Sequence, residues 1–296
     1  MGNLLAGFLL LSVMVASAGA AEGQFRGKVR FNAPDGSKMD GVRCAVVDVS
    51  PTLEVLKGMR TAENSRTLQA VANISIPVAF HVITGSSGAG DVPVSLLNAQ
   101  IDVLNLAYAA HGFSFSLASV DVTANDEWYT AVPDSFAEVQ MKGALAIDPA
   151  HTLNVYTASP GGGLLGWATF PWYYDNESDT RHGVVILNES VPGGSAAPFN
   201  EGHTLTHEIG HYLGLFHTFQ GGCRRPGDYM RDTPAERTPT SGCPASKDSC
   251  TRQRGLDPIH NYMDYSDDFC MTEFTDLQRA YMNWATARYR PGLLAP

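Results

Sequence analysis

Five residues in one short segment have the types and the spacing of a metal site. The segment reads His207-Glu208-x-x-His211-x-x-Gly214-x-x-His217. Residues four apart lie on the same face of a helix, so His207 and His211 can offer ring nitrogens to one ion. Gly214 permits the left-handed turn that ends such a helix, after which His217 returns as a third ligand. Three imidazoles leave the fourth position of a tetrahedral zinc ion open for water, which predicts a catalytic zinc site.

The glutamate of this motif predicts the reaction. Zinc lowers the pKa of a bound water toward ~7, and a nearby carboxylate can take its proton as the water attacks a peptide carbonyl. The carboxylate then returns the proton to the leaving amine, so we expect Glu208 to act as general base and general acid. Five specified residues at fixed spacing arise by chance in about one chain in ten thousand of this length, which disfavours an accidental cluster.

A second motif follows further along the chain. The residues Asn261-Tyr262-Met263-Asp264-Tyr265 resemble the methionine turn that runs beneath the zinc site of metzincin proteases. The resemblance implies that Met263 forms an apolar floor under the three histidines. Tyr265 lies two residues beyond, and we expect its hydroxyl to donate to the oxyanion of the tetrahedral intermediate.

Several motifs in a fixed order resemble one family. Gly166–Trp172 (GWATFPW), the zinc motif, Gly227–Pro234 (GDYMRDTP) and Asn261–Cys270 (NYMDYSDDFC) are similar to the pappalysin family of metzincins, and most to its small secreted members. The similarity covers about Ile74 to Arg290. It implies the metzincin zincin fold, with an upper subdomain that has a twisted mixed sheet and the active-site helix. The lower subdomain, after Gly214, is then irregular and held by disulfides.

The pattern of the first half agrees with an α/β or α+β fold. Strands and a helix alternate there, as in a layer of helices on a mostly parallel sheet. The first strand contains Pro77, which favours an edge strand or a bulge. The expected strands are Ile74–Ile83, Phe113–Val122, Leu153–Ala158 and Gly183–Leu187, and the expected helix is Val94–Ala110. The glycines at 161–163 and the aromatic run Trp167–Tyr174 predict a long connection, either beside a substrate cleft or in an ordinary packed loop.

Four of the five cysteines lie in the predicted lower subdomain, at Cys223, Cys243, Cys250 and Cys270. Three pairings are open to four cysteines, and spacing alone does not choose between them. The family resemblance implies Cys223 with Cys250 and Cys243 with Cys270. A second zinc site made of cysteines is disfavoured, because no CxxC spacing occurs.

The fifth cysteine, Cys44, lies in a polar stretch before the predicted catalytic domain. A thiolate there can take the fourth zinc position and displace the attacking water, which would keep a precursor latent. The alternative is a free thiol or one paired between molecules. Residues 59–66 (MRTAENSR) are predicted to be exposed, with Arg60 and Arg66 as candidate cleavage sites.

The N-terminus predicts export. An apolar run from Leu4 to Val15 precedes the small residues 16–21, as in a secretory signal peptide, although an uncleaved anchor is the alternative. We therefore divide the chain into a signal peptide at residues 1–20, a pro-segment at 21–66 and a metzincin catalytic domain at 67–296. The mature protein is expected to be secreted and extracellular.

The amino-acid composition restricts the kinds of partner that the protein is expected to bind. The 296 residues include 30 Asp and Glu against 20 Lys and Arg, which gives a formal net charge of -10. This balance argues against nucleic acid as a partner, because phosphate-binding surfaces need clustered basic residues. We expect protein or peptide substrates and no stable membrane insertion once the signal is removed. Two other functions stay open, namely a metzincin-like binding module without catalysis and a zinc amidase acting on cell-wall peptide.

Acidic residues of the lower subdomain suggest one further metal. Asp228, Asp232, Thr233 and Glu236 offer oxygen ligands within a short loop, so structural calcium is a hypothesis against a solvated acidic loop. We interpret Asp267-Asp268 as a solvated acidic turn, with a preference for basic substrate side chains as the alternative. The other histidines have no partners at ligand spacing and are expected to be ordinary surface or core residues. They are His81, His111, His151, His182, His203 and His260.

Overall fold

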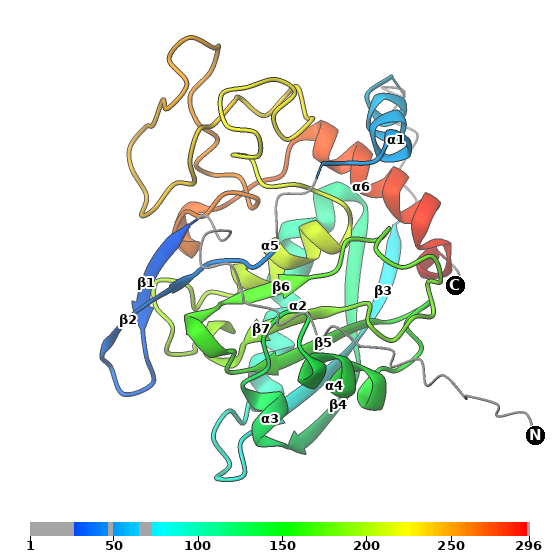
Figure 1. The fold of residues 1–296 in the computed structure, drawn as a ribbon, viewed down its shortest axis with the longest axis vertical. Coiled ribbons are helices and arrows are strands. Elements are labelled where there is room, and N and C mark those ends of the chain that lie inside the picture. Colours follow the sequence, from blue (N-terminus) through cyan, green and yellow to red (C-terminus); the bar gives the residue numbers. More distant parts are fainter. Residues whose placement is uncertain (1–26, 47–49, 65–72, 295–296) are drawn as a thin grey trace, which may run out of the picture.

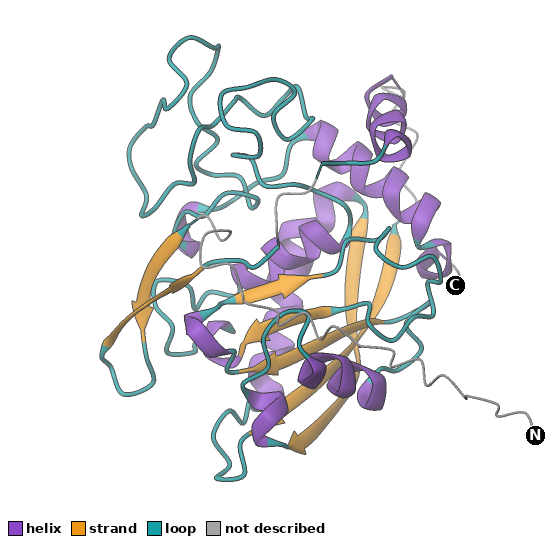
Figure 2. Cartoon of the chain, in the orientation of Figure 1, coloured by secondary structure: helices purple, strands orange, loops and turns teal. Residues whose placement is uncertain are grey.

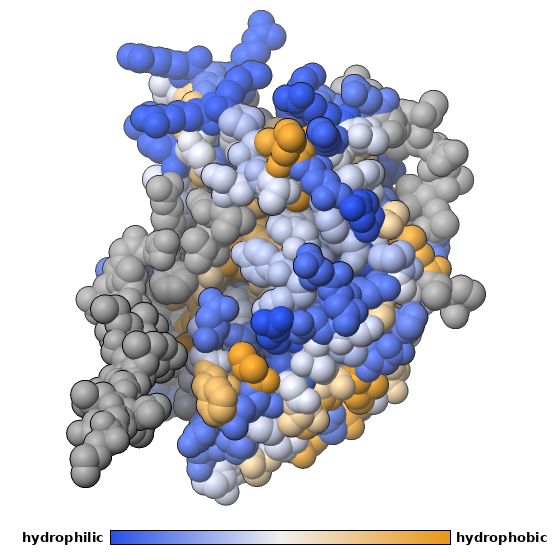
Figure 3. Space-filling model, turned by 45° about the vertical axis from the view of Figure 1, so that its right-hand side comes forward, coloured by the Kyte–Doolittle hydropathy of each residue, from blue (hydrophilic) through white to orange (hydrophobic). Residues whose placement is uncertain are grey.

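The computed structural model describes residues 27–46, 50–64 and 73–294. The predicted signal peptide at 1–20 and the candidate cleavage site Arg66 lie outside these ranges. No helix within them is both long enough and apolar enough to cross a membrane. On the face shown in Figure 3, hydrophobic side chains appear as scattered patches among polar ones.

A five-stranded mixed sheet forms the centre of the molecule (Figures 1 and 2). In spatial order its strands are β4 (Phe113–Ala124), β3 (Ile74–Thr84), β5 (Leu153–Ala158), β7 (Val184–Leu187) and β6 (Gly166–Ala168). The first four run parallel, and β6 pairs antiparallel with β7 at the edge. The mixed sheet confirms the predicted fold class.

The predicted strands are found, and the structure chooses between the two alternatives that Pro77 left open. The strand that contains Pro77 is not an edge strand, because β3 lies between β4 and β5. The register with β4 shifts between Val78 and Ala79, so the missing N–H of proline is accommodated by a bulge instead. Strand β6 was not predicted, because three residues are too short for a periodic pattern.

Helices cover both faces of the sheet. Alternate residues of β3, such as Val78, Phe80 and Val82, pack toward α2 (Val94–Tyr108) and α5 (His203–Tyr212). On the other face, Ile83 of β3 belongs to a smaller cluster with residues of the helical region that includes α3 (Asp126–Tyr129) and α4 (Phe136–Leu145). This two-residue alternation is what a sheet buried on both sides requires.

The segment between α5 and the last helix, α6 (Asp276–Tyr289), has almost no regular structure (teal in Figure 2). Only the short 3-10 helix η4 (Asp268–Cys270) interrupts it. Disulfides join Cys223 to Cys250 and Cys243 to Cys270, each across 27 residues. This is the pairing that the family resemblance implies, and it leaves none of these four sulfurs for a second zinc.

The polar N-terminal region contains structure that its sequence pattern did not predict. Strands β1 (Lys28–Asn32) and β2 (Lys38–Val42) form an antiparallel hairpin. A turn at Pro34-Asp35-Gly36 connects them, and Gly36 has the positive φ of +81° that favours glycine there. Figure 1 shows this hairpin beside the edge of the sheet that carries β6.

The prediction of an exposed stretch at 59–66 is wrong for its described part. Residues Leu53–Asn64 form helix α1, which lies along α6 in Figure 1. Met59 and Ala62 are buried against the main core, whereas Arg60 is exposed on the helix. The charged residues hid an amphipathic pattern, in which Met59 and Ala62 face the core while Arg60 and Asn64 stay exposed.

Gly58 sets the closest contact between α1 and α6. A Cβ atom at this position would lie 1.9 Å from the ring of Trp284. We predict that Gly58→Ala lowers the melting temperature of the precursor, because α1 must move away from α6, at a cost of about 1 to 3 kcal/mol. Differential scanning calorimetry measures the change.

The matched control is Gly143→Ala in α4, where a Cβ would meet no atom within 4 Å. Alanine in a helix interior is favoured over glycine by about 0.5 to 1 kcal/mol, so this variant should be slightly more stable. The same substitution is thus expected to lower the stability of the protein in α1 and to raise it in α4. Equal melting temperatures for wild type and Gly58→Ala would contradict the docking of α1.

Candidate metal centre

The structure brings the three predicted zinc ligands together. His207 and His211 face the same side of α5, whose end is followed by Gly214 with a φ of +102°. The chain then returns, and His217 meets the helix. The Nε2 atom of His211 lies 3.2 Å from that of His207 and 3.0 Å from that of His217, and all three rings are buried.

Backbone carbonyls orient two of these rings. The Nδ1 atom of His207 lies 2.7 Å from the carbonyl oxygen of Tyr262, and that of His211 lies 2.7 Å from the carbonyl of Leu215. A carbonyl can only accept, so each Nδ1 carries the proton and each Nε2 points its lone pair inward. Burial also lowers the pKa of His207 and His211 well below the ordinary value, which keeps them neutral.

This donor set fits zinc. Inward lone pairs about 3 Å apart repel one another, and a cation placed between them removes the conflict. Neutral imidazole nitrogens are preferred zinc ligands, and sites made of three histidines with an open fourth position are catalytic. The predicted ligands therefore form a site that a zinc ion can complete.

Glu208 lies beside this cluster with an unsatisfied carboxyl group. It is fully buried, and among the described residues its Oε1 atom has no hydrogen-bond partner. Burial raises the pKa of Glu208 to about 8. Strand β6 passes close by, since a Cβ on Gly166 would lie 3.1 Å from Oε1. The carboxyl group therefore lies between α5 and the edge of the sheet, with one oxygen free to accept a proton.

Neighbouring elements hold α5 in place. The hydroxyl of Tyr108 in α2 donates to the carbonyl of Thr206 at 2.8 Å. Beneath the helix, a Cβ on Gly210 would lie 2.3 Å from the sulfur of Met263, so the missing side chain makes room for the methionine. Met263 therefore packs against the helix that carries His207 and His211.

Tyr265 reaches the edge of the histidine cluster. Its hydroxyl oxygen lies 3.1 Å from Nε2 of His217 and donates to the carbonyl of Cys44 at 3.4 Å. The ring is buried against His217 and Phe219. The hydroxyl therefore faces a backbone carbonyl at the place where we expect the carbonyl of a substrate.

Cys44 enters the cluster from the N-terminal segment. Its sulfur and the ligand nitrogens of the three histidines all lie within 4.8 Å of one another. The thiol is buried, and Sγ donates to Oε2 of Glu208 at 3.5 Å. Cys44 and the three histidines therefore form one buried group of four side chains that could hold a metal ion.

The neighbour of Cys44 makes a buried ion pair. Arg43 donates to Asp268 at 3.0 Å and to the hydroxyl of Thr204 at 3.0 Å, and its guanidinium lies over the ring of Phe199. Both side chains of the ion pair are completely buried. The interpretation of residue 268 as part of a solvated acidic turn is therefore wrong. Sequence patterns missed this pair because 225 residues separate its members.

The four candidate calcium ligands do not converge. Asp228 accepts from the hydroxyl of Thr233, with its two oxygens 2.8 and 2.7 Å away. Asp232 accepts from the backbone of Leu277 at the start of α6, and Glu236 pairs with Lys247. Only two of the four residues therefore meet, and the calcium hypothesis stays a prediction.

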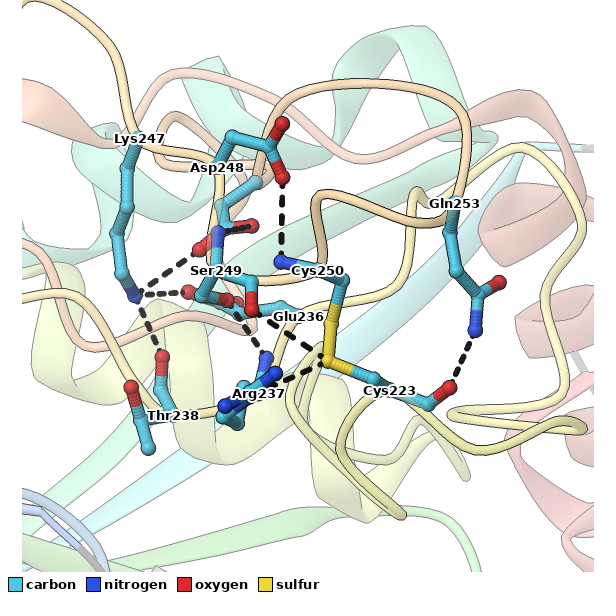
Figure 4. The surroundings of a disulfide bond; sticks show 10 residues. Cys223, Glu236, Arg237, Thr238, Lys247, Asp248, Ser249, Cys250 and Gln253 are labelled. Atoms are coloured by element: carbon cyan, nitrogen blue, oxygen red, sulfur yellow. Dashed lines mark hydrogen bonds and ion pairs between the residues drawn. A yellow bond between two sulfur atoms is a disulfide. The ribbon is translucent and has the colours of Figure 1, made fainter.

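Lys247 provides a positive charge to the lower loops (Figure 4). Its ammonium group lies 2.7 Å from Glu236, 3.1 Å from the hydroxyl of Thr240 and 3.2 Å from Asp257, and it also donates to the carbonyl of Thr238. These oxygens resemble the surroundings of a bound cation, with the ammonium in its place. The disulfide between Cys223 and Cys250 lies beside it.

The remaining histidines lie outside the zinc ligand set. His260 alone approaches sulfur, with its Nδ1 atom 3.6 Å from Sγ of Cys270, but that sulfur is in a disulfide. His81 is buried between Asp121 and Asn154, and His182 is buried against Tyr174.

Comparison with known proteins agrees with this geometry. The family described as Pregnancy-associated plasma protein-A matches residues 140–287. An extracellular metalloprotease of Neurospora crassa is 44% identical over 255 residues, which is 82% of this chain and 85% of that protein. One of Podospora anserina is 39% identical over 296 residues, or 94% and 98% of the two chains.

Solved structures are similar as well. A point mutant of promirolysin from Tannerella forsythia has a TM-score of 0.67 and 28% identity, and covers 80% of this chain and 91% of its own. Mature mirolysin in complex with a cleaved peptide has a TM-score of 0.63 and 28% identity, with 76% and 99% covered.

Removal of the Lys247 charge tests whether this ammonium group stabilises the lower loops. We predict that Lys247→Ala lowers the melting temperature by several degrees, because Glu236 and Asp257 are then buried without a counter-charge. Breaking a buried pair typically costs about 3 to 5 kcal/mol, and less where one partner is partly exposed, as Lys247 is. The control is Arg254→Ala, an exposed residue of the same region. Equal losses in both variants would contradict this role of Lys247.

A calcium-selective chelator tests the calcium hypothesis. If Asp228 and Thr233 help to bind structural calcium, the chelator should lower the melting temperature of the wild-type protein. An unchanged melting temperature and unchanged activity would contradict it.

Proposed function

Because this chain belongs to the pappalysin family of metzincins and is a zinc-dependent endopeptidase, we propose that His207, His211 and His217 bind its catalytic zinc and that Glu208 is its general base. The observation that carries the proposal is the convergence of three buried Nε2 atoms beside the carboxyl group of Glu208, whose Oε1 atom has no partner among the described residues. Peptide and protein substrates follow from the protease family. The binding module and the cell-wall amidase that the sequence leaves open find no support among the relatives.

The residues around the site have separate roles in hydrolysis. When bound, zinc supplies a Lewis acid that polarises the substrate carbonyl and acidifies water. Glu208 accepts the proton of the attacking water and delivers it to the amine nitrogen that leaves. The hydroxyl of Tyr265 donates to the carbonyl oxygen as negative charge develops on it. Its present acceptor, the carbonyl of Cys44, supports this assignment.

The edge of the sheet supplies a binding surface for an extended chain. The amide of Leu165 donates to the carbonyl of Val42 at 3.0 Å, and the carbonyl of Gly166 accepts from the amide of Ala45 at 3.0 Å. These are main-chain contacts that any sequence can make, as in strand addition to a sheet edge. We propose that a substrate uses the same donors and acceptors.

Arg43 supports a preference for basic side chains next to the scissile bond. It is adjacent to Cys44, and its guanidinium contacts Thr204, Asp268 and the ring of Phe199, which we propose form a pocket once Arg43 has left. A buried carboxylate without a positive partner is costly, so the pocket favours an arginine or lysine once Arg43 has left. The side chain that the enzyme recognises is therefore of the same kind as the one its own pro-segment supplies.

We propose that the protein is exported as a latent precursor. The extracellular relatives support residues 1–20 as a signal peptide and secretion of the protein. The position of Cys44 supports latency, since a thiolate at the fourth coordination position leaves no room for water. Residues 21–66 are the proposed pro-segment, and 67–296 the catalytic domain. Cleavage at Arg60 would require α1 to unwind, so a site beyond α1, such as Arg66, is the better candidate.

The role of Glu208 is tested by its removal. We predict that Glu208→Ala abolishes hydrolysis of casein by the processed enzyme while zinc content, measured by plasma mass spectrometry, stays at one ion per chain. The matched control is Glu201→Ala, an exposed carboxylate just before α5, which should retain activity. Full activity of Glu208→Ala would refute the mechanism.

The latency of the precursor is tested at Cys44. We predict that Cys44→Ala precursor hydrolyses a small fluorogenic peptide before processing, and matures faster than wild type, because water regains access to the zinc position. Lys28→Ala, an exposed residue of the same segment, serves as the control. If the Cys44→Ala precursor is as latent as the parent, the thiol switch is wrong.

The proposed specificity pocket is tested at Asp268. We predict that Asp268→Asn lowers kcat/KM for peptides with arginine beside the scissile bond by about 30-fold or more, since a buried charge pair is lost. Peptides with leucine at that position should change by less than about threefold. Cleavage mapping in a peptide library measures both values. An equal decrease for both substrates would indicate general damage to α5, whose N-terminal amides also bind Asp268.

A further inference from the structure

The hairpin β1–β2 makes contacts with the catalytic domain that do not involve the zinc position. Val29 and Phe31 of β1 are buried, and they form one apolar cluster with residues of the catalytic domain. That cluster contains Leu165, Leu187, Ala196 and Phe199. Phe31 has 1% of its surface exposed, so it is as deeply buried as a core residue. The cluster thus anchors the segment at a distance from Cys44 in the sequence.

The backbones of the two parts also fit closely. A Cβ on Gly41 would lie 2.1 Å from the carbonyl oxygen of Gly163, so β2 approaches the glycine turn at 161–163 as closely as glycine allows. At the other end of the hairpin, the amide of Asn32 donates to the carbonyl of Ala197 at 2.9 Å. The glycine cluster therefore borders the pro-segment.

Gly27, the described residue just before β1, lies at the active site. A Cβ on Gly27 would lie 2.2 Å from the ring of Tyr265, so the backbone at Gly27 rests directly on that ring. The amide of Arg43 donates to the carbonyl of Gly27 at 3.4 Å and closes the segment on itself. Both ends of the segment 27–46 therefore lie over the active site.

We propose that Gly27–Val46 is a self-contained inhibitor that stays bound after the chain is cut beyond Val46 and inhibits the mature enzyme in trans. It binds by the apolar face of the hairpin, by Arg43 in the acidic pocket and by Cys44 at the zinc position. The contact of Cys44 at the zinc position rests on the proposed function, whereas the contact of the hairpin's apolar face does not. Activation then requires the segment to dissociate or to be degraded, in addition to the cut.

The inference predicts how the intact precursor behaves when it is cut. After limited proteolysis of wild-type precursor, the N-terminal fragment should co-elute with the catalytic domain in size-exclusion chromatography, and activity should stay low. In the Phe31→Ala precursor the fragment should separate, and activity should appear at once. A wild-type fragment that dissociates freely on cleavage would overturn the proposal.

A synthetic peptide of residues 27–46 separates the contacts. It should inhibit the enzyme that has been freed of its pro-segment, and its Kd for the uncleaving Glu208→Ala enzyme follows from fluorescence anisotropy. Removal of the buried aromatic ring in Phe31→Ala should weaken binding at least tenfold, whereas the exposed Lys28→Ala should leave it unchanged. A Phe31→Ala peptide that binds as tightly as the parent overturns the proposal.

The Cys44→Ala peptide distinguishes this inference from the thiol switch. It should bind more weakly than the parent but still measurably, because the hairpin and Arg43 remain. If Cys44→Ala binds like the parent while Phe31→Ala binds weakly, the thiol switch fails and the hairpin inhibitor stands. Complete loss of binding in Cys44→Ala would show that the hairpin is no independent anchor.

Discussion

The hydrogen bond from His207 to the carbonyl of Tyr262 joins the two halves of the catalytic site. His207 belongs to a helix packed on the sheet, whereas Tyr262 belongs to a loop of the irregular lower part. The bond fixes which nitrogen carries the proton, and therefore where the lone pair points. A shift of that loop by a few tenths of an ångström would misdirect a zinc ligand, so the loop must be nearly as rigid as the helix.

The lower half obtains this rigidity without regular secondary structure. Two interleaved disulfides tie its ends, and Lys247 draws acidic and hydroxyl groups around one ammonium. Asn261 binds the side chain of Gln278, which itself belongs to the capping box of α6. The methionine turn is thereby attached to α6, and this attachment holds the carbonyl of Tyr262 in place.

The sequence predicts those parts of the structure that depend on residues near one another along the chain. The zinc motif and four strands depend on residues close together in the sequence, and the structure contains the strands and brings the three histidines together. The ion pair of Arg43 with Asp268 and the docking of α1 on α6 depend on residues more than 200 positions apart, which no window along the chain contains. Strand β6 was missed for a different reason. Its three residues owe their conformation to pairing with β7 rather than to their own pattern.

The pro-segment shows how a chain can lie in a protease active site without being cut. Cleavage needs a water molecule between Glu208 and the metal, and a carbonyl at the position where negative charge is stabilised. Here the sulfur of Cys44 faces Glu208, while the carbonyl of the same residue accepts from Tyr265. With the roles proposed above for Glu208 and Tyr265, this one residue takes both the place of the nucleophile and the place of the substrate carbonyl. In the proposed precursor, the groups for hydrolysis are in position while Cys44 excludes the attacking water, and the contacts of the hairpin hold Cys44 there.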